Sequence, residues 1–401
     1  MELERISALC QKTASRIVLA LVDGLGGLPD PKTGKTELET ARTPNLDFLA
    51  RKGACGLTDP VGVGITSGSA PGILALLGYD PLRYLIGRGA LEAVGVDFDL
   101  QEGDVAARGN FCTVDSAGLI SDRRAGRITT DNCVELCRLM SKIELGSGVQ
   151  TFVLPVREHR FALVLRSPGL SDQLADSDPQ NVGVAPNTVK ALAPQAEATA
   201  ELFNRFIAQG KRLLKAHHPA NMFLLRGFSH RPHHPSLSKV YSLYPAAIAV
   251  YPMYRGLARL VGMKLLATGS TVEDEFKMLK EHFSEHDFFF VHIKKTDMAG
   301  EDGDFKLKVS AIEHVDEALP VVMDLHPDVL IVTGDHSTPA TMKGHSWHPV
   351  PFLLYSKWCR GSDIEKCSER TFLRGELGRF PAHDAMALAM AHGLKLTKYG
   401  A

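Results

Sequence analysis

Three acidic positions each follow an apolar run that is typical of a buried strand. Asp23 ends the run at residues 16–23, Asp297 stands just beyond the run at residues 287–293, and Asp335 with His336 ends the run at residues 328–336. Ligands of α/β sheets bind at the carboxyl ends of the strands, so we expect these side chains to meet at one edge. Converging carboxylates repel each other unless cations neutralise them. An isolated Asp-His pair would more simply be a turn with a capping aspartate, but three such positions favour a metal site of Mn²⁺, Zn²⁺ or Mg²⁺.

A serine-containing loop supplies a candidate nucleophile. The run VGVGITSGSAPG at residues 61–72 leads into the apolar residues 73–77, which predict a helix. The first turn of a helix offers free backbone N–H groups and the positive end of the helix dipole, which stabilise an alkoxide and later a phosphate on the same oxygen. A bound metal would lower the hydroxyl pKa further. Taken alone, such a serine is more simply an N-cap; beside a two-metal site, the nucleophile becomes the better interpretation.

The elements that position these residues predict an α/β fold. The three apolar runs suit strands that are covered on both faces, as in a mainly parallel sheet. Amphipathic helices are expected between them at residues 272–282 and 306–324. Residues 104–238 differ in character, with shorter strands at 161–165 and 222–225 and a helix at 195–216. We therefore predict a metal-binding core of residues 1–103 and 239–401, flanked by helices, and an inserted smaller α+β domain of residues 104–238.

Composition narrows the class of protein. The 401 residues carry a formal net charge of −1, which favours neither nucleic acid nor a membrane surface as a partner. An anionic ligand must therefore be bound by local positive groups or metals. The N-terminus lacks the features of a signal peptide, and no apolar run approaches the roughly 18 residues of a membrane span. Seven scattered cysteines without a CxxC pair suit reduced thiols, so a cytoplasmic location is expected.

Several motifs, in order along the chain, resemble one enzyme family. They are LVDGLGG, TELETARTPNLDFLA, the serine loop leading to GYDP, GRGALEAVG, RGNFCTVD, SDRRAGR, YPMYRGLARLVGM, HIKKTD, TGDHSTP and the final KYGA. From about residue 16 to its end, the chain resembles the archaeal-type cofactor-independent (2,3-bisphosphoglycerate-independent) phosphoglycerate mutases of the alkaline phosphatase superfamily. The resemblance implies an alkaline-phosphatase-like core. It also implies interconversion of 2-phosphoglycerate and 3-phosphoglycerate through a phosphoserine, without an organic cofactor.

The same resemblance implies a role for individual residues. It places the attacking serine at Ser69 rather than Ser67, and it implies two divalent ions, with Mn²⁺ expected and Mg²⁺, Co²⁺ or Zn²⁺ as alternatives. One ion would be held by Asp23, Ser69, Asp335 and His336. The other would be held by Asp297, His345 and the residue four positions after Asp297. The family usually has histidine at that last position, and this chain has Glu301, which would favour harder ions such as Mn²⁺ or Mg²⁺ over Zn²⁺.

A small phosphorylated acid is the expected partner, and paired guanidinium groups suit its phosphate and carboxylate. The candidate substrate-binding residues are Arg123, Arg124, Arg127, Arg88, Arg108, Lys294 and Lys295. Glu301, together with His348 and Ile73, departs from the family pattern, so a catalytically weakened homologue is an alternative. A phosphohydrolase, or a mutase of another phosphorylated metabolite on the same core, is a second alternative. Assembly into a homo-oligomer is left open.

Overall fold

The computed structural model describes residues 3–400, in which β1 (Ile17–Val22) lies inside an eight-stranded sheet. The strand order is β13-β2-β12-β11-β1-β10-β8-β9. The other strands are β2 (Ala54–Asp59), β8 (Pro245–Ile248), β9 (Lys264–Leu266), β10 (Phe288–Ile293), β11 (Val329–Thr333), β12 (Val350–Ser356) and β13 (Gly378–Pro381). β1 runs parallel to both β10 and β11, while β12 is antiparallel to β11 and β2. The predicted mainly parallel sheet is confirmed.

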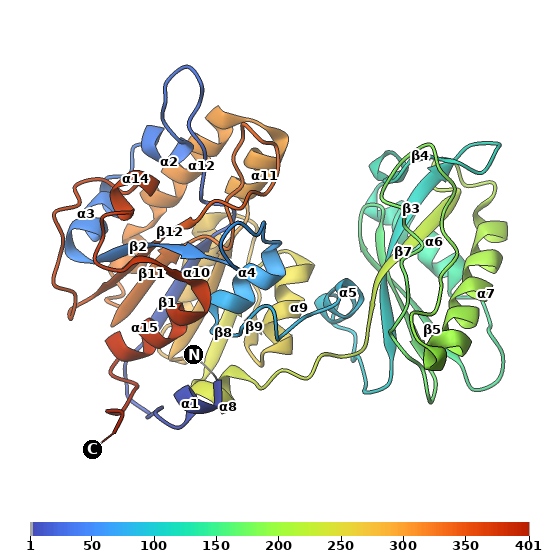
Figure 1. Ribbon diagram of the computed structural model, residues 1–401, viewed down its shortest axis with the longest axis horizontal. Helices are drawn as coiled ribbons and strands as arrows, with labels where there is room; N and C mark the ends of the chain where they lie inside the picture. Colours follow the sequence, from blue (N-terminus) through green and yellow to red (C-terminus); the bar gives the residue numbers. More distant parts are fainter. Residues whose placement is uncertain (1–2, 401) are drawn as a thin grey trace. The chain divides into compact units, whose positions relative to one another are not determined.

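Helices cover both faces of this sheet (Figure 1). The Val18, Ala20 and Val22 side of β1 packs in one apolar core with α3 (Pro44–Lys52), α10 (Val272–His282) and α12 (Phe305–Ala318). On the other face, α15 (Ala385–His392) contacts β11 and α4 (Ser69–Leu76). The other helical elements outside residues 86–233 are α1 (Leu3–Ser7), α2 (Glu37–Thr40), α8 (Leu237–Tyr241), α9 (Pro252–Leu260), α11 (Lys295–Asp302), α13 (Pro320–Met323), α14 (Glu369–Phe372) and η3 (Ala382–Asp384).

The predicted helices are present, with one correction. The helix expected at residues 272–282 is α10. The single helix expected at residues 306–324 is wrong, because the structure divides it into α12 and α13. Pro320 begins the second piece, since proline has no N–H for the helical hydrogen bond and is well placed in a first turn.

The chain divides into two units, and the second is built on a separate sheet. The first unit contains the residues up to 85, 234–254 and the residues from 261 onward; the second contains 86–233 and 255–260. In the second unit the strand order is β4-β3-β6-β5, with β7 also paired to β3, and all of these neighbours are antiparallel. Its elements are α5 (Arg88–Gly95), β3 (Val105–Val114), β4 (Ile120–Asp122), η1 (Ala125–Arg127), α6 (Thr130–Met140), β5 (Gln150–Arg157), β6 (Arg160–Arg166), η2 (Pro194–Ala196), α7 (Glu197–Leu214) and β7 (Met222–Ser229).

The second unit has helices on both faces of its sheet. Alternate residues of β3 take part in different cores: Val105 and Ala107 pack with α6 and α7, and Ala106 packs with α5. The expected inserted domain began at residue 104, whereas α5 lies in the second unit because its apolar face packs on β3 and β6. Within residues 3–400, no helix combines the length and apolar character needed to cross a membrane.

Candidate active site

The register of three parallel strands brings the predicted ligands to one edge. Val22 of β1 lies opposite Ile293 of β10, and Leu21 of β1 lies opposite Thr333 of β11. The residues that follow these strands therefore emerge side by side. Every residue of β1, β10 and β11 is buried, as their mostly apolar sequences predict. The acidic candidate ligands lie in the residues that follow the strands.

Asp23, Asp335 and His336 form the first cluster, which we call the serine-side group. One ligand atom from each lies within 4.8 Å of the others. His336 Nε2 is 3.4 Å from Asp23 Oδ1 and 3.3 Å from Asp335 Oδ2. All three residues are fully buried. This group matches the protein side chains expected to hold one metal beside Ser69.

Asp297, His336 and His345 form the second cluster, which we call the outer group. Their ligand atoms also lie within 4.8 Å of one another, and His345 Nε2 is 3.6 Å from Asp297 Oδ1. His336 is shared between the two groups, and its ring stacks on that of His345 with centroids 3.6 Å apart. Glu301, which the resemblance implied as the third ligand beside Asp297 and His345, is not one of these three residues.

Hydrogen bonds orient both histidines. His345 Nδ1 lies 2.9 Å from the carbonyl oxygen of Ser67, which can only accept, so Nδ1 carries the proton and Nε2 is left bare. His336 Nδ1 lies 2.9 Å from the Thr338 hydroxyl, which itself donates to Asp297 Oδ1 over 2.7 Å. His336 Nδ1 is therefore the donor, and its Nε2 is also bare. Each Nδ1–H is thus held by a hydrogen bond, as in metal-ligating histidines, and each unprotonated Nε2 faces carboxylates.

The charges at this edge do not balance without a cation. Lys294 pairs with two of the three carboxylates: its Nζ lies 3.0 Å from Asp23 Oδ2 and 2.5 Å from Asp297 Oδ2. Burial raises the pKa of Asp335 well above its usual range, and the charges of Asp23 and Asp297 add to the rise. Burial also opposes ionisation of Asp23, but Lys294 and then His292 outweigh it and hold its pKa well below the usual range.

The donor set fits divalent ions. Asp23 Oδ1 and Asp335 Oδ2 are buried, and neither oxygen has a hydrogen-bond partner among residues 3–400. Burial, as the main cause, lowers the pKa of His336 to about 4, so its imidazole is neutral and able to ligate. Two carboxylate oxygens without hydrogen-bond donors, beside the neutral imidazole of His336, are a metal-binding arrangement of the kind that Mn²⁺ or Zn²⁺ accepts.

Ser69 lies against the serine-side group. It is the first residue of α4, and its Oγ is 3.1 Å from His336 Nε2. Gly72 lets α4 come this close, because a Cβ there would stand 2.0 Å from the carbonyl oxygen of Asp335. Ser67, in contrast, is buried and its hydroxyl donates to the carbonyl of Gly68. Of the two serine hydroxyls, only that of Ser69 contacts a metal-ligand residue; Ser67 contacts His345 through its carbonyl oxygen.

Glycine is also required directly after Asp23. Gly24 has a φ of 67°, in the left-handed region that L side chains rarely adopt. A Cβ there would lie 2.6 Å from the Thr338 hydroxyl and 3.0 Å from the Cα of Asp297. The tight turn allows the Gly24 N–H to donate to Asp335 Oδ1 over 3.2 Å, which ties the ends of β1 and β11 together.

Three other predicted residues of the first unit, Lys294, Lys295 and Glu301, differ in how close they lie to the two metal-ligand groups. Lys294 lies inside the cluster and pairs with both Asp23 and Asp297. Lys295 is exposed at the start of α11. The Glu301 side chain is 56% exposed, and its carboxylate is 3.9 Å from His345 Nε2. Glu301 is thus near the outer group but is not one of its three members.

In the second unit, Arg108 lies in a cluster of positive charge. Burial lowers its pKa to about 10; Glu92, 3.4 Å away, offsets part of this, and the charges of Arg160, Arg88 and Arg226 lower it further. The guanidinium remains charged at neutral pH. Several cations held near one buried position are costly unless an anion joins them, so this cluster suits an anionic ligand.

The SDRRAGR run is only partly available for binding. Arg123 donates two hydrogen bonds to Asp178, of 3.1 Å and 2.7 Å, in the bidentate geometry of a structural ion pair. Arg124 and Arg127 are exposed. Sequence reasoning missed Arg160 and Arg226, because they are isolated basic residues in strands whose antiparallel pairing with β3 brings them beside Arg108.

Three side chains next to the two metal-ligand groups were also not predicted from the sequence. They are Tyr254, His292 and Thr338. Tyr254 donates to Asp23 Oδ2 over 2.5 Å, and His292 Nε2 lies 2.9 Å from the same oxygen. The available signals were a lone histidine in the apolar run before Lys294 and a tyrosine in the YPMYRGLARLVGM motif.

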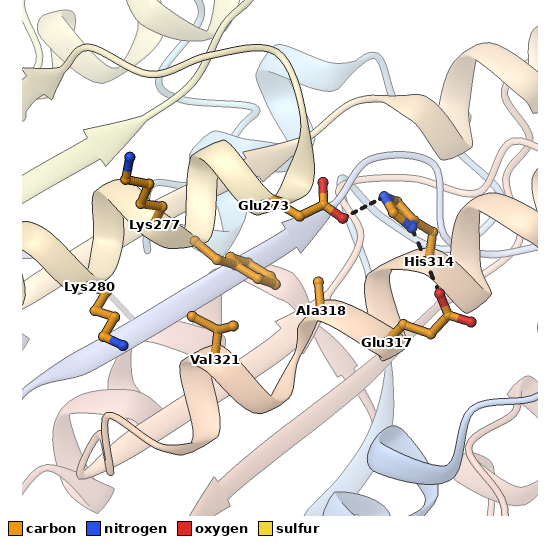
Figure 2. Close-up of a pocket in the computed structure, with 8 residues that line it drawn as sticks. Glu273, Lys277, Lys280, His314, Glu317, Ala318 and Val321 are labelled. Atoms are coloured by element: carbon orange, nitrogen blue, oxygen red, sulfur yellow. Dashed lines mark ion pairs between the residues drawn. The ribbon is translucent and has the colours of Figure 1, made fainter.

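A surface pocket elsewhere on the first unit offers a contrast. It is bounded by α10 and by α12 and α13, with a volume of about 350 Å³. Figure 2 shows Val321 and Ala318 on its apolar side and a rim in which His314 pairs with Glu273 and Glu317. The two carboxylates that meet His314 are exposed, and the residues that line the pocket include no serine, threonine or cysteine, so the cluster at the strand ends is the stronger candidate site.

Several known proteins are similar to this chain. The family model described as 2,3-bisphosphoglycerate-independent phosphoglycerate mutase matches residues 50–221. A protein of Aquifex aeolicus named as a probable enzyme of this kind is 50% identical, with 99% of each chain covered. A Thermus thermophilus protein of the same name is 48% identical over 99% of this chain and 98% of the relative.

Two solved structures have the same fold over nearly the full chain. The cofactor-independent phosphoglycerate mutase of Thermoplasma acidophilum is 30% identical with a TM-score of 0.71, covering 94% of this chain and 100% of that one. A Pyrococcus horikoshii protein is 28% identical with a TM-score of 0.84, covering 97% and 100%. The Aquifex relative has the same residue at half of the aligned positions, over nearly the full length of both chains. Proteins that share only a fold have far lower sequence identity. The chain belongs to the 2,3-bisphosphoglycerate-independent phosphoglycerate mutase family.

Proposed function

We propose that this protein interconverts 2-phosphoglycerate and 3-phosphoglycerate through a phosphoserine on Ser69. The observation that carries the proposal is the position of Ser69 at the start of α4, 3.1 Å from His336 and beside the serine-side group. The naming of close relatives as probable phosphoglycerate mutases supports the choice of substrate.

Two divalent ions would be held by the serine-side group with Ser69 and by the outer group, and Mn²⁺ suits this set of carboxylates and imidazoles. When bound, they would supply positive charge for the transferring phosphoryl group and lower the pKa of the attacking hydroxyl. Lys294, already between Asp23 and Asp297, contributes a fixed positive charge. The backbone N–H groups at the start of α4 add donors for the phosphate oxygens.

The chemistry divides into two displacements. Ser69 Oγ attacks the substrate phosphorus, the bond to the glycerate oxygen breaks, and a phosphoserine with bound glycerate results. The other glycerate hydroxyl then attacks the phosphoserine, which returns the phosphate and regenerates Ser69. Arg108 and its neighbours Arg88, Arg160 and Arg226 are the groups that we propose for the carboxylate of the substrate. Water in place of glycerate in the second step would make the protein a phosphohydrolase.

The test is a comparison of Ser69→Ala with Ser67→Ala. Both variants and the wild type are loaded with Mn²⁺, and formation of 2-phosphoglycerate and of free phosphate from 3-phosphoglycerate is followed. We expect the wild type and Ser67→Ala to form 2-phosphoglycerate, Ser69→Ala to be inactive, and mass spectrometry to find phosphate on Ser69. An active Ser69→Ala variant would exclude the assigned nucleophile. Free phosphate as the main product of the wild type would show a phosphohydrolase instead.

A further inference from the structure

The two carboxylate oxygens of Asp23 have different surroundings. Oδ2 receives hydrogen bonds from the Tyr254 hydroxyl at 2.5 Å, from His292 Nε2 at 2.9 Å and from Lys294 Nζ at 3.0 Å. Oδ1 is buried, 3.4 Å from His336 Nε2, and within the described chain it accepts no hydrogen bond. Three donors occupy one oxygen of the carboxylate and leave the other for a metal.

Tyr254 is held in a single orientation. The residue is 1% exposed, and its ring stacks on His292 with centroids 3.6 Å apart. Lys294 Nζ donates to the phenol oxygen over 2.9 Å, so the phenol proton cannot point at Lys294. It points to Asp23 Oδ2 at 2.5 Å, the shorter of its two other contacts.

The second of those contacts is Ser69. The Tyr254 hydroxyl lies 3.3 Å from Ser69 Oγ, so one oxygen touches both the carboxylate and the candidate nucleophile. Lys294 also contacts Asp23, but its other partners are Asp297 and Tyr254 itself. Tyr254 thus contacts Asp23 and Ser69 together, as the metal-ligand residue His336 does, without being a member of either metal-ligand group.

We propose that Tyr254, supported by His292, is a positioning residue that holds Asp23 through Oδ2 and so presents Oδ1 to the metal of the serine-side group. The part of the inference that concerns the reaction rests on the proposed function; the part that concerns metal binding does not. Partners that orient a ligating side chain typically change metal affinity by about 10- to 100-fold when they are removed. Tyr254→Phe removes only the hydroxyl and keeps the stacked ring.

The control is Tyr79→Phe. Tyr79 is also fully buried in the first unit, and its hydroxyl donates to the Pro235 carbonyl over 2.6 Å, so this variant loses an equivalent buried hydrogen bond away from the cluster. Titration calorimetry with Mn²⁺ alone, on metal-stripped full-length protein, is the measurement. We expect one of the two Mn²⁺ sites to weaken by about 10- to 100-fold in Tyr254→Phe, and both sites of Tyr79→Phe to match those of the wild type.

His292 provides a second route to the same conclusion. Glutamine keeps an N–H donor for Asp23, whereas leucine does not, so His292→Gln should retain Mn²⁺ affinity that His292→Leu loses. With phosphoglycerate as substrate, Tyr254→Phe should lower kcat and leave KM unchanged, because the substitution does not alter the arginines proposed to bind the substrate.

The thermal midpoint of each metal-free variant shows whether that variant is folded.

The outcomes separate the two proposals. Equal Mn²⁺ affinity in Tyr254→Phe and the wild type overturns the inference, whatever the activity. Weakened Mn²⁺ binding in Tyr254→Phe, with a wild type that forms no 2-phosphoglycerate, supports the positioning role and rejects the proposed function alone.

Discussion

The imidazole rings of His336 and His345 stack with their centroids 3.6 Å apart, and this contact joins the two metal-ligand groups. Stacking keeps both bare Nε2 atoms at the same edge of the sheet while each ring is fixed by its own Nδ1 hydrogen bond. His336 is common to both groups, whereas His345 belongs to the outer group alone. The two sites should therefore respond differently to loss of His345.

His345→Gln should lower the Mn²⁺ content of the protein from two ions to one. The outer group loses an imidazole ligand, and the serine-side group keeps Asp23, Asp335 and His336. Elemental analysis after dialysis against Mn²⁺ measures the stoichiometry. His348→Gln is the matched control, because His348 lies in the same loop, bonded to the Ser346 hydroxyl, and belongs to neither group. Two ions retained in His345→Gln would contradict the assignment of the outer group.

Arg108→Gln should raise the KM for phosphoglycerate by about 10- to 100-fold, since a charge-assisted contact to a substrate anion is lost. Glutamine keeps a polar side chain in the cluster while removing the charge. Steady-state kinetics provide the measurement. Arg166→Gln is the control, because Arg166 pairs with Asp104 in the same unit through two hydrogen bonds of 2.7 Å. Similar KM values for Arg108→Gln and the wild type would remove Arg108 from the substrate site.

Gly72→Ala should reduce kcat by about 100-fold, as expected when a reacting group is displaced by about 1 Å. The new methyl would meet the backbone oxygen of Asp335 at 2.0 Å, so α4 and Ser69 must move away from His336. Gly344→Ala is a stringent comparison: it lies next to His345, and a Cβ there has no described atom within 4 Å. If both variants keep wild-type kcat, the close approach of α4 is not needed for the reaction.

Glu275 should make the protein less stable as the pH rises. It is 4% exposed in α10, and burial, with Asp274 and Glu273 nearby, raises its pKa to about 8. Because the folded state holds this proton more tightly than the unfolded state, the free energy of unfolding falls from about pH 4.5 to pH 8 and then levels off. Glu275→Gln has no ionisable group at this position, so its free energy of unfolding should not fall in this way.

The measurement is the thermal midpoint at pH 5 and pH 9. At pH 9 the midpoint of Glu275→Gln should exceed that of the wild type by roughly 5 °C, and at pH 5 the two should be close. Glu281→Gln makes the same chemical change at an exposed position of α10 and should give no such gain. An equal difference at both pH values would show that Glu275 is already ionised without cost.

Features encoded by local runs of sequence could be predicted, and features that depend on distant pairing could not. The strand before Asp23 and the helix at residues 272–282 follow from their own periodicity. Tyr254 and His292 meet Asp23 from segments more than 200 positions away, and no local pattern marks such a contact. Arg160 and Arg226 were missed for the same reason. The start of the second unit was placed too late because α5 packs by tertiary contact with β3.

The order of the strands has a consequence for how the protein is made. β1 pairs with β10 and β11, which leave the ribosome only after the whole second unit has been synthesised. A nascent chain therefore carries Asp23 and Ser69 long before Asp335 and His336 exist, and metal capture must come late in biosynthesis. The second unit, whose sheet is complete by Ser229, is free to fold during translation, while β1 waits for both of its neighbours.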